Sequence, residues 1–339
     1  MYALKYGIIK TAFELLSLSK IPNIIRHFSK CRGIIFTLHR IIPDDVAPFQ
    51  PNAILQITPD FLEIVIKKIR SSGFDIVDLD EAMVRISSNT RKKPFIVFTF
   101  DDAYRDNLIY ALPILRKHNC PFTLFVPTGF VDGRGELWWQ VIEDIIRDNN
   151  AVIFNNHEFA TTTRSQKQKA YEIIYWQMRD MKENERIIKT KEFAKKYDVD
   201  MSKHCQELIM NWQELEIFVN EPLCTIGAHT VNHYELAKLD AKEAKWEMQQ
   251  SADIFEEKYN KRPKHFSYPI GAIRSASNKE YDLAKQLGFA TGVTTLPGGL
   301  YKKHKDSFHS LPRVSLNGYF QKRRYLDVFL TGAIFNKRK

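Results

Sequence analysis

Short apolar runs alternate with amphipathic segments along most of this 339-residue chain, and this alternation limits the possible fold most strongly. Runs rich in β-branched and aromatic residues are typical of buried strands. Such strands are predicted at residues 33–40, 94–100, 121–126 and 224–229. Between them, residues 58–73 have the pattern of a helix that begins after an N-cap at Thr58 and ends at Gly73. Repeated β-α units indicate parallel strands with helices outside them, and about seven units favour a barrel over an open sheet.

The alternation of strand and helix patterns stops between about residues 133 and 210, where helical patterns follow one another without clear strands. Within this stretch only residues 149–160 have the pattern of a small hairpin. We therefore predict one domain over residues 31–335, interrupted by a mostly helical insertion at about 133–210.

The first thirty residues form an amphipathic extension. Leu4, Ile8, Leu15 and Leu16 fall on one helical face, and Lys5, Lys10 and Lys20 lie off it. This helix either packs on the domain or lies as a basic interfacial helix on an anionic membrane surface. Residues 336–339 add a basic tail.

The charge balance favours anionic partners without identifying one. Lys and Arg exceed Asp and Glu by 50 to 40. Such an excess attracts nucleic acid, acidic lipid or acidic glycan, and it also serves as ordinary solubilising surface. Because no nucleic-acid-binding motif is present, we expect no nucleic-acid partner.

Cysteine spacing and the N-terminal residues indicate a cytoplasmic protein. The four cysteines, at positions 31, 120, 205 and 224, are far apart and include no C-x-x-C pair, so reduced thiols are expected. No apolar run reaches the roughly 18 residues of a spanning helix, and the N-terminus does not read as a signal peptide. The alternative is peripheral contact with the inner membrane face.

Three predicted strand ends carry unusual polar groups. The first is Thr99-Phe100-Asp101-Asp102, in which neighbouring carboxylates repel unless each has a cation, a metal or hydrogen-bond donors. A loop turn with an aspartate N-cap would also explain this pair. In a parallel barrel the carboxyl ends of the strands meet at one mouth, where active sites are built.

The second strand end carries two histidines. His229 and His233 are four residues apart, and one helical turn would bring both imidazoles to the same side. Such pairs also arise by coincidence. Two histidines and one aspartate make the ligand set of a catalytic zinc site with an open position.

The third strand end is residues 265–271, HFSYPIG, where Pro269 and Gly271 force a sharp exit from the strand. Such a turn can aim a backbone N–H at a developing oxyanion.

The ordered motifs T-F-D-D, H-T-x-x-H and F-x-Y-P-x-G resemble the polysaccharide deacetylases, the NodB-homology fold of carbohydrate esterase family four. The resemblance covers roughly residues 94–296 and extends back to residues 33–40, which look like the segment before the core in many bacterial members. It implies a distorted (β/α)7 barrel and a divalent metal, usually zinc, bound by Asp102, His229 and His233. It further implies that Asp101 is the general base and that the backbone N–H of Ile270 stabilises the oxyanion.

The sequence departs from the family pattern at three places. Ala103 follows the aspartates where Gly is common, and alanine fits only if its φ is not positive. Ser267 replaces an Arg that orients the base, and we expect Arg313, taken to follow a late strand, to supply that contact unless it lies on the surface. No late L-x-H motif supplies the general acid, and His39 is the alternative unless it is a structural histidine.

Aromatic residues near the motifs are candidates for sugar contact. Trp138 and Trp139 open the insertion, where paired tryptophans fill a core or stack on a sugar ring. Tyr104, Tyr268 and Pro269 belong to the motifs and are expected to line the same cleft.

The resemblance implies a hydrolase of carbon–nitrogen bonds other than peptide bonds. Its substrate would be an acetylated amino sugar in an oligo- or polysaccharide or its precursor, with N-acetyl favoured over O-acetyl. The alternatives are an amidohydrolase of a small molecule and a non-catalytic carbohydrate-binding barrel. The sequence does not indicate the sugar or the oligomeric state.

Overall fold

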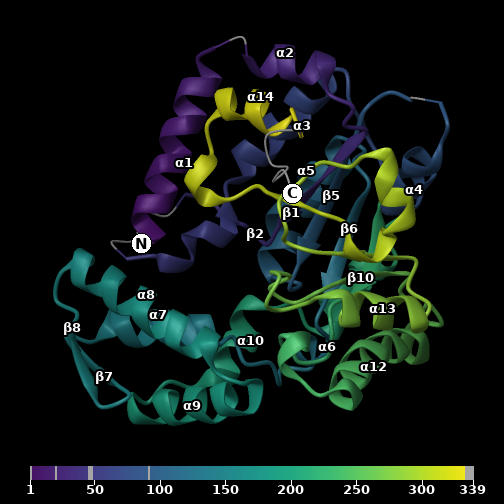
Figure 1. The fold of residues 1–339 in the computed structure, drawn as a ribbon. Helices are drawn as coiled ribbons and strands as arrows, with labels where there is room; N and C mark the ends of the chain where they lie inside the picture. The colour runs from purple at the N-terminus through teal and green to yellow at the C-terminus, as the bar shows by residue number, and fades with distance from the viewer. Residues whose placement is uncertain (1, 20, 45–48, 91, 333–339) are drawn as a thin grey trace.

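A parallel sheet lies at the centre of the computed structural model, which describes residues 2–19, 21–44, 49–90 and 92–332 (Figure 1). The basic tail expected at 336–339 lies outside these residues. Within them, the sheet has eight strands. Seven follow the order β11-β10-β9-β6-β5-β1-β12, and the eighth, β4, pairs with β5. The strands are β1 (Gly33–Leu38), β4 (Asp75–Ile76), β5 (Phe95–Asp101), β6 (Phe122–Val126), β9 (Cys224–Ala228), β10 (His265–Ser267), β11 (Thr291–Val293) and β12 (Val314–Ser315).

Every strand pair in this sheet is parallel, and the sheet curls into an open, distorted barrel. A single parallel bridge joins Val293 of the edge strand β11 to Leu311, which lies three residues before the other edge strand, β12. The predicted α/β barrel is therefore confirmed. Because all strands run the same way, their carboxyl ends open at one end of the barrel.

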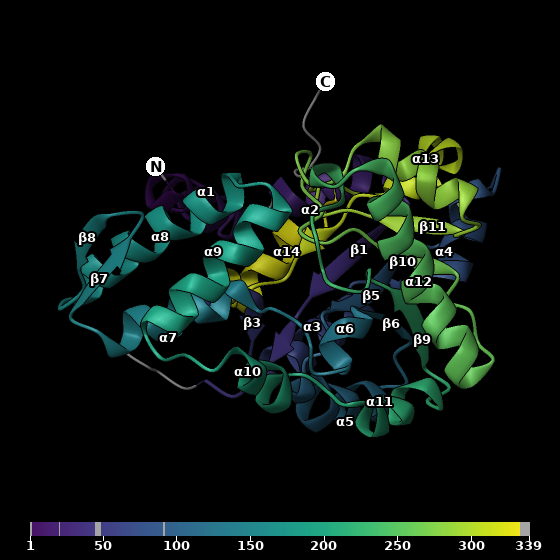
Figure 2. The ribbon, with the colours of Figure 1, turned by 90° about the horizontal axis from the view of Figure 1, so that it is seen from below.

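Helices cover the outside of the sheet, and α12 and α13 lie together beside β10 and β11 (Figure 2). The helices are α1 (Tyr2–Ser17), α2 (Ile21–Phe28), α3 (Pro59–Ser71), α4 (Leu79–Ser87), α5 (Leu112–Lys117), α6 (Thr128–Val131), α7 (Trp138–Asp148), α8 (Arg164–Asp180), α9 (Glu183–Lys196), α10 (Met201–Leu208), α11 (Trp212–Val219), α12 (Ala241–Tyr259), α13 (Asn278–Gln286) and α14 (Leu326–Phe329). Thr58 caps α3 as expected, accepting a hydrogen bond from the Phe61 N–H at 3.1 Å. In the described residues, every helix falls short of the length and apolar character needed to span a bilayer.

The stretch between β6 and β9 is mostly helical. It contains α6 to α11 and one antiparallel hairpin, β7 (Ala151–Phe154) with β8 (His157–Ala160). Asn155 and Asn156 turn the hairpin with φ of 48° and 61°, as two-residue hairpin turns require. In Figure 1 the helices α7, α8 and α9 and the hairpin lie to one side of the sheet.

The N-terminal extension forms two helices rather than one. Pro22 lies in the first turn of α2 and has no N–H to continue α1, which ends at Ser17. Phe13 of α1 is buried against Phe320 and Phe329, with ring centroids 4.8 and 5.1 Å apart. The extension thus packs on the domain through the C-terminal segment.

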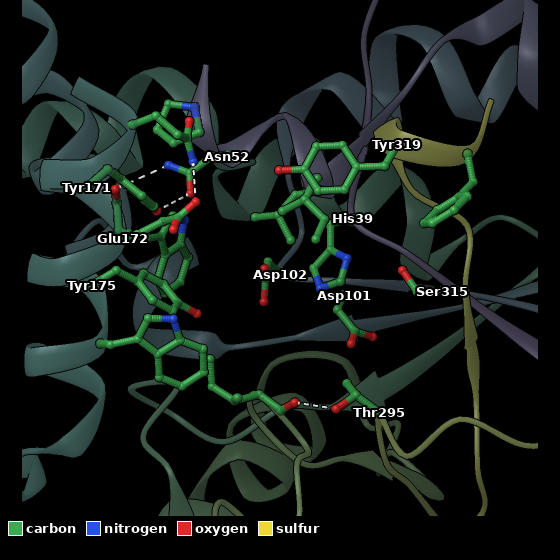
Figure 3. Close-up of a pocket in the computed structure, with 18 of the residues that line it drawn as sticks. His39, Asn52, Asp101, Asp102, Tyr171, Glu172, Tyr175, Thr295, Ser315 and Tyr319 are labelled. Carbon is green, nitrogen blue, oxygen red and sulfur yellow. Dashed lines mark hydrogen bonds between the residues drawn. The ribbon is translucent and has the colours of Figure 1, made fainter. Parts of the chain in front are cut away.

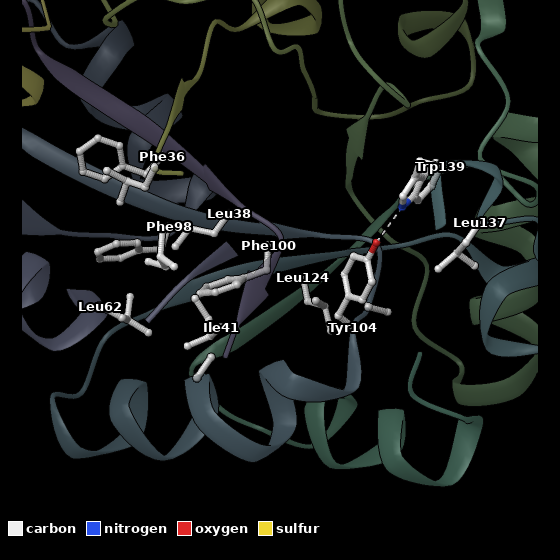
Figure 4. Packing of buried hydrophobic residues seen from close by; sticks show 14 of the residues in the cluster. Phe36, Leu38, Ile41, Leu62, Phe98, Phe100, Tyr104, Leu124, Leu137 and Trp139 are labelled. Carbon is white, nitrogen blue, oxygen red and sulfur yellow. Dashed lines mark hydrogen bonds between the residues drawn. The ribbon is translucent and has the colours of Figure 1, made fainter. Parts of the chain in front are cut away.

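Aromatic and aliphatic side chains fill the space between the sheet and its helices (Figure 4). Phe36, Phe98 and Phe100 on adjacent strands are at most 1% exposed. Burying each ring contributes roughly 2 kcal/mol. The four cysteines, all in the described part of the chain, are thiols as expected, and three are buried.

Candidate active site

Asp101 and Asp102 lie at the carboxyl end of β5 and have different partners. Arg313 donates to both carboxylate oxygens of Asp101, from Nη1 to Oδ1 at 2.8 Å and from Nη2 to Oδ2 at 2.7 Å. All three residues are at most 3% exposed. Burial raises the pKa of Asp101, but the charge and hydrogen bonds of Arg313 outweigh it and hold the pKa below its ordinary value. Asp101 is therefore ionised and held in one orientation.

Arg313 reaches this position from the loop before β12, not from the end of a strand as expected. Its Nε donates to the carbonyl of Thr294 at 2.9 Å. Its Nη1 also contacts Thr99 Oγ1 at 3.1 Å, and its Nη2 contacts Ser267 Oγ at 3.0 Å. Ser267, which occupies the position where the family commonly has arginine, thus joins the same network.

Asp102, His229 and His233 form a possible metal-binding triad. One ligand atom from each lies within 4.8 Å of the others, and all three residues are buried. Asp102 Oδ1 is 3.4 Å from His229 Nε2 and 3.3 Å from His233 Nε2. In the described structure this oxygen is buried and has no hydrogen-bond partner. Burial raises the pKa of Asp102, but the nearby His233 and His229 hold it well below its usual range.

This donor set fits a divalent cation. The Nδ1 of His229 lies 2.6 Å from the carbonyl oxygen of Ser267, so Nδ1 is the donor and Nε2 is the nitrogen left to bind a cation. Metal-binding histidines are usually oriented by such a bond. A buried carboxylate oxygen without a hydrogen bond is costly, and a cation between these atoms would satisfy it.

The two histidines are not on a helix. Residues 229–233 form a loop in which Thr230 and His233 have φ of 63° and 58°. This loop, rather than one helical turn, brings the ring centroids to 4.9 Å. The expectation from the spacing of four residues was correct about proximity and wrong about its cause.

Glu247 of α12 holds this loop. Its carboxylate accepts from the N–H groups of Val231 and Asn232, both at 2.9 Å, and from the Asn232 side-chain amide at 2.6 Å. Glu247 is 3% exposed, and burial raises its pKa despite these hydrogen bonds. Sequence reasoning missed Glu247 because it lies within an ordinary amphipathic helix pattern.

Left-handed backbone conformations gather at the motifs. Ten non-glycine residues of the described chain have positive φ. Four of these lie in the three motifs, at Asp102, Thr230, His233 and Ile270, and a fifth, Ala103, directly follows the first motif. Ala103 has φ of 57°, so the expectation that alanine requires a negative φ here is wrong. Such strain persists where the surroundings enforce it, typically at functional sites.

The turn after β10 places Ile270 at the site. Its φ is 60°, and the Gly271 N–H donates to the Pro269 carbonyl at 2.6 Å, closing a three-residue turn. A Cβ on Gly271 would lie 2.7 Å from the Thr295 backbone nitrogen, so the turn needs glycine there. In the described structure the Ile270 N–H makes no hydrogen bond, whereas its carbonyl accepts from Thr295 Oγ1 at 2.6 Å.

His39 follows β1 and lies beside Asp101 and Asp102 in the same cavity (Figure 3). Asn107 Nδ2 donates to the His39 carbonyl at 2.9 Å. Asp106 accepts from the next two residues, the guanidinium of Arg40 and the Ile41 N–H, both at 2.8 Å. The polar residues after the paired aspartates thus hold the His39 segment. Burial lowers the pKa of His39, although the charges of Asp102 and Asp101 raise it.

A cavity of about 530 Å³ opens over these residues. One wall is α8, whose Gln168, Tyr171, Glu172, Tyr175 and Trp176 follow helical spacing and face the cavity. Figure 3 shows Tyr171, Glu172 and Tyr175 across from His39, Asp101 and Asp102. This wall was missed because its pattern is that of any amphipathic helix.

Trp139 is the one expected sugar-contact residue that lines the cavity. Its Nε1 donates to Tyr104 Oη at 3.3 Å (Figure 4). Its ring packs against His233, with the centroids 5.3 Å apart.

The other four expected contacts lie in the protein interior, behind the cavity wall. Tyr104 and Trp138 are each 2% exposed, and Trp138 packs on Tyr175. Tyr268 is fully buried and donates to the His309 carbonyl at 2.8 Å. Pro269 is buried too. None of these four residues lines the cavity, so their contact with substrate remains a prediction that the structure does not support.

The chain matches the model of the polysaccharide deacetylase family over residues 88–292, which is more than half of its length. It therefore belongs to the polysaccharide deacetylase family. YxkH of Bacillus subtilis (strain 168), assigned to the polysaccharide deacetylases, is 21% identical over 260 residues. That match covers 74% of this chain and 65% of YxkH, so the chain spans just under two thirds of this relative.

Solved structures share the fold. A deacetylase, PplD from Streptococcus pyogenes, in complex with acetate, has a TM-score of 0.52 and 18% identity, covering 88% of this chain and 97% of that one. IcaB from Ammonifex degensii has a TM-score of 0.55 and 16% identity, and the match again covers 88% of this chain and 97% of that one. At these identities the likeness extends to the barrel alone.

Proposed function

We propose that this protein is a hydrolase that removes an acetyl group from an amino sugar of an oligo- or polysaccharide, with a divalent metal ion, most simply zinc, held by Asp102, His229 and His233. The observation that supports it best is the pairing of an ionised, oriented Asp101 with this triad at the floor of one cavity. When bound, the ion supplies Lewis-acid chemistry, polarising a carbonyl and making water more acidic. Family membership supports a polysaccharide substrate.

The residues around the triad supply the proton transfers and the oxyanion contact. Asp101 takes a proton from the attacking water, whose oxygen bonds to the acetyl carbonyl carbon. The Ile270 N–H donates to the oxyanion that forms. His39, in its protonated form, gives a proton to the leaving nitrogen as the C–N bond breaks, which releases acetate and a free amine. Arg313 acts through Asp101 as a positioning residue.

The α8 wall supports a sugar ligand over a small amide. Tyr175 and Trp176 offer aromatic faces, and Gln168 and Glu172 offer polar groups in the same cavity. Sugar rings combine apolar faces with hydroxyl groups, so such a wall suits them. N-acetyl is favoured over O-acetyl, because a leaving amine needs the proton that His39 can supply.

Metal content tests the triad directly. We expect protein purified without chelator to contain about one divalent ion per chain, and His229→Ala to lose it. Surface His157→Ala is the matched control and should keep the metal, because His157 is exposed in β8. A metal-free wild-type protein that releases acetate from an N-acetylglucosamine oligomer would contradict the proposal.

A further inference from the structure

The two N-terminal helices expose an apolar surface that the active site does not use. In α1, Ile8, Leu15 and Leu18 just beyond its end are 63%, 68% and 74% exposed. In α2, Ile21, Ile24 and Phe28 are 47%, 56% and 79% exposed. We refer to these six side chains as the N-terminal apolar surface. Their spacing places each set on one helical face, and clustered exposure of this kind marks an interaction site.

Helix α1 is held on the domain by its other face, and Pro22 of α2 is buried, so this exposure is not a sign of loose packing. Phe13 is 5% exposed among the aromatic rings of the C-terminal segment. Glu14 is hydrogen-bonded to Lys322, Arg324 and Tyr325. A docked helix therefore presents an apolar face outward.

The charges around this surface are basic. The first 32 residues contain six Lys and Arg and one acidic residue, Glu14, and so account for half of the chain's net charge of +10. Lys10, His27 and Lys30 are exposed, and each lies within two residues of Ile8 or Phe28 in the sequence. A second copy of this chain would bring like charges together in a two-fold contact, whereas an anionic lipid layer attracts them.

The surface also adjoins the active-site cavity. Gly7 and Lys10 of α1 line that cavity, and Ile8 lies between them in sequence on the exposed side. Figure 1 shows α1 above α8, which forms the opposite wall. A lipid layer against α1 would therefore lie next to the cavity opening.

We propose that the N-terminal apolar surface docks the protein on an anionic membrane surface and that its substrate is a glycan attached to a membrane lipid. The apolar side chains enter the interfacial layer, and the basic side chains contact lipid phosphates. The sugar end of the lipid then reaches Asp101 and the triad past α1. This inference rests on the proposed deacetylase function for its substrate, but not for the docking.

Vesicle flotation tests the docking. We expect the wild-type chain to float with phosphatidylcholine vesicles that contain phosphatidylglycerol, and to do so less as salt is raised. The variant Leu15→Ser/Leu18→Ser/Phe28→Ser should bind at least tenfold more weakly. Ile273→Ser is the matched control, because Ile273 is 72% exposed elsewhere, and it should float like the wild type. Equal flotation of the triple variant, or no flotation of the wild type, would overturn the docking.

Two substrates separate the docking from the activity. On a soluble N-acetylglucosamine oligomer, the triple variant should release acetate as fast as the wild type. On the same oligomer attached to a phospholipid in those vesicles, its rate should fall at least tenfold. Equal rates of the two proteins on the vesicle substrate would overturn the proposal that the substrate is attached to a lipid. If the wild type releases acetate from neither substrate, the proposed function is overturned, but the flotation result still tests the docking.

Discussion

At the scale of single residues, each of the two adjacent carboxylates has its own partners. Arg313 binds both oxygens of Asp101, and Asp102 faces His229 and His233. The charge of Arg313 offsets part of the repulsion between the neighbouring carboxylates. It also gives them different roles, because only Asp102 has a buried oxygen without a partner in the described structure.

Replacing Arg313 tests the orientation of Asp101. Arg313→Ala leaves a buried carboxylate unpaired and should lower the free energy of unfolding by about 3 to 5 kcal/mol. Arg313→Lys keeps the charge but loses the bidentate contact, so it should lower the free energy of unfolding less than Arg313→Ala does. Because a single contact orients Asp101 poorly, we expect acetate release by Arg313→Lys to fall about a hundredfold.

Chemical denaturation and acetate release measure these two effects. Arg262→Lys is the control, because its ion pairs with Asp253 and Glu256 are on the surface and should contribute little. Wild-type acetate release by Arg313→Lys would show that this contact does not position the base.

At the scale of elements, strand ends provide the proposed catalytic groups, and side chains from neighbouring elements fix the loops that follow them. The loop after β9 has no regular structure of its own and is held by Glu247 of α12. The His39 segment after β1 is held by Asp106 and Asn107, which follow β5. Preorganisation of the site therefore depends on residues outside the motifs.

Replacing Glu247 tests this support. Glu247→Ala leaves two buried N–H groups without an acceptor and should lower the free energy of unfolding by about 2 to 4 kcal/mol. Because His233 then loses its fixed position, metal affinity should fall roughly 10-fold to 100-fold. Metal titration and chemical denaturation measure both effects. Glu257→Ala, on the exposed face of the same helix, should change neither, and tight metal binding by Glu247→Ala would rule out the supporting role.

At the scale of the whole molecule, packing between β10 and α4 makes stability depend on pH. His265 is fully buried in β10, 2.9 Å from Thr291 Oγ1 and 3.4 Å from Asp80 of α4. Burial lowers its pKa from 6.5 to about 4. Between these values the unfolded chain binds the proton and the folded chain does not, so stability is lost as the pH falls.

The size of this effect is up to roughly 3 kcal/mol between pH 6.5 and pH 4. We expect His265→Asn to lose less stability than the wild type over this range, measured by denaturation at each pH. Exposed His157→Asn should lose as much as the wild type. An unchanged pH dependence in His265→Asn would contradict the assignment.

Short motifs at the predicted strand ends allowed the fold and part of the candidate site to be predicted from the sequence. The barrel and a cluster of aspartate and histidine at its mouth follow from local patterns and from the convergence of parallel strands, whereas the separate roles of Asp101 and Asp102 come from the resemblance to the family. The contact of Arg313 with Asp101 was predicted because Ser267 left the carboxylate without a cation. The α8 wall and Glu247 were not predictable, because their roles depend on how amphipathic helices pack. Trp138 shows the same limit, since burial and sugar contact favour the same residue type.

The measurement that most directly tests the account is acetate release from an N-acetylglucosamine oligomer after chelation and after zinc is added back. We predict that chelation stops release by the wild type and that zinc restores it. Asp101→Asn should bind zinc like the wild type, because Asp101 is not in the triad, and should release acetate at least a hundredfold more slowly. Release that survives chelation, or Asp101→Asn that works at the wild-type rate, would contradict the account.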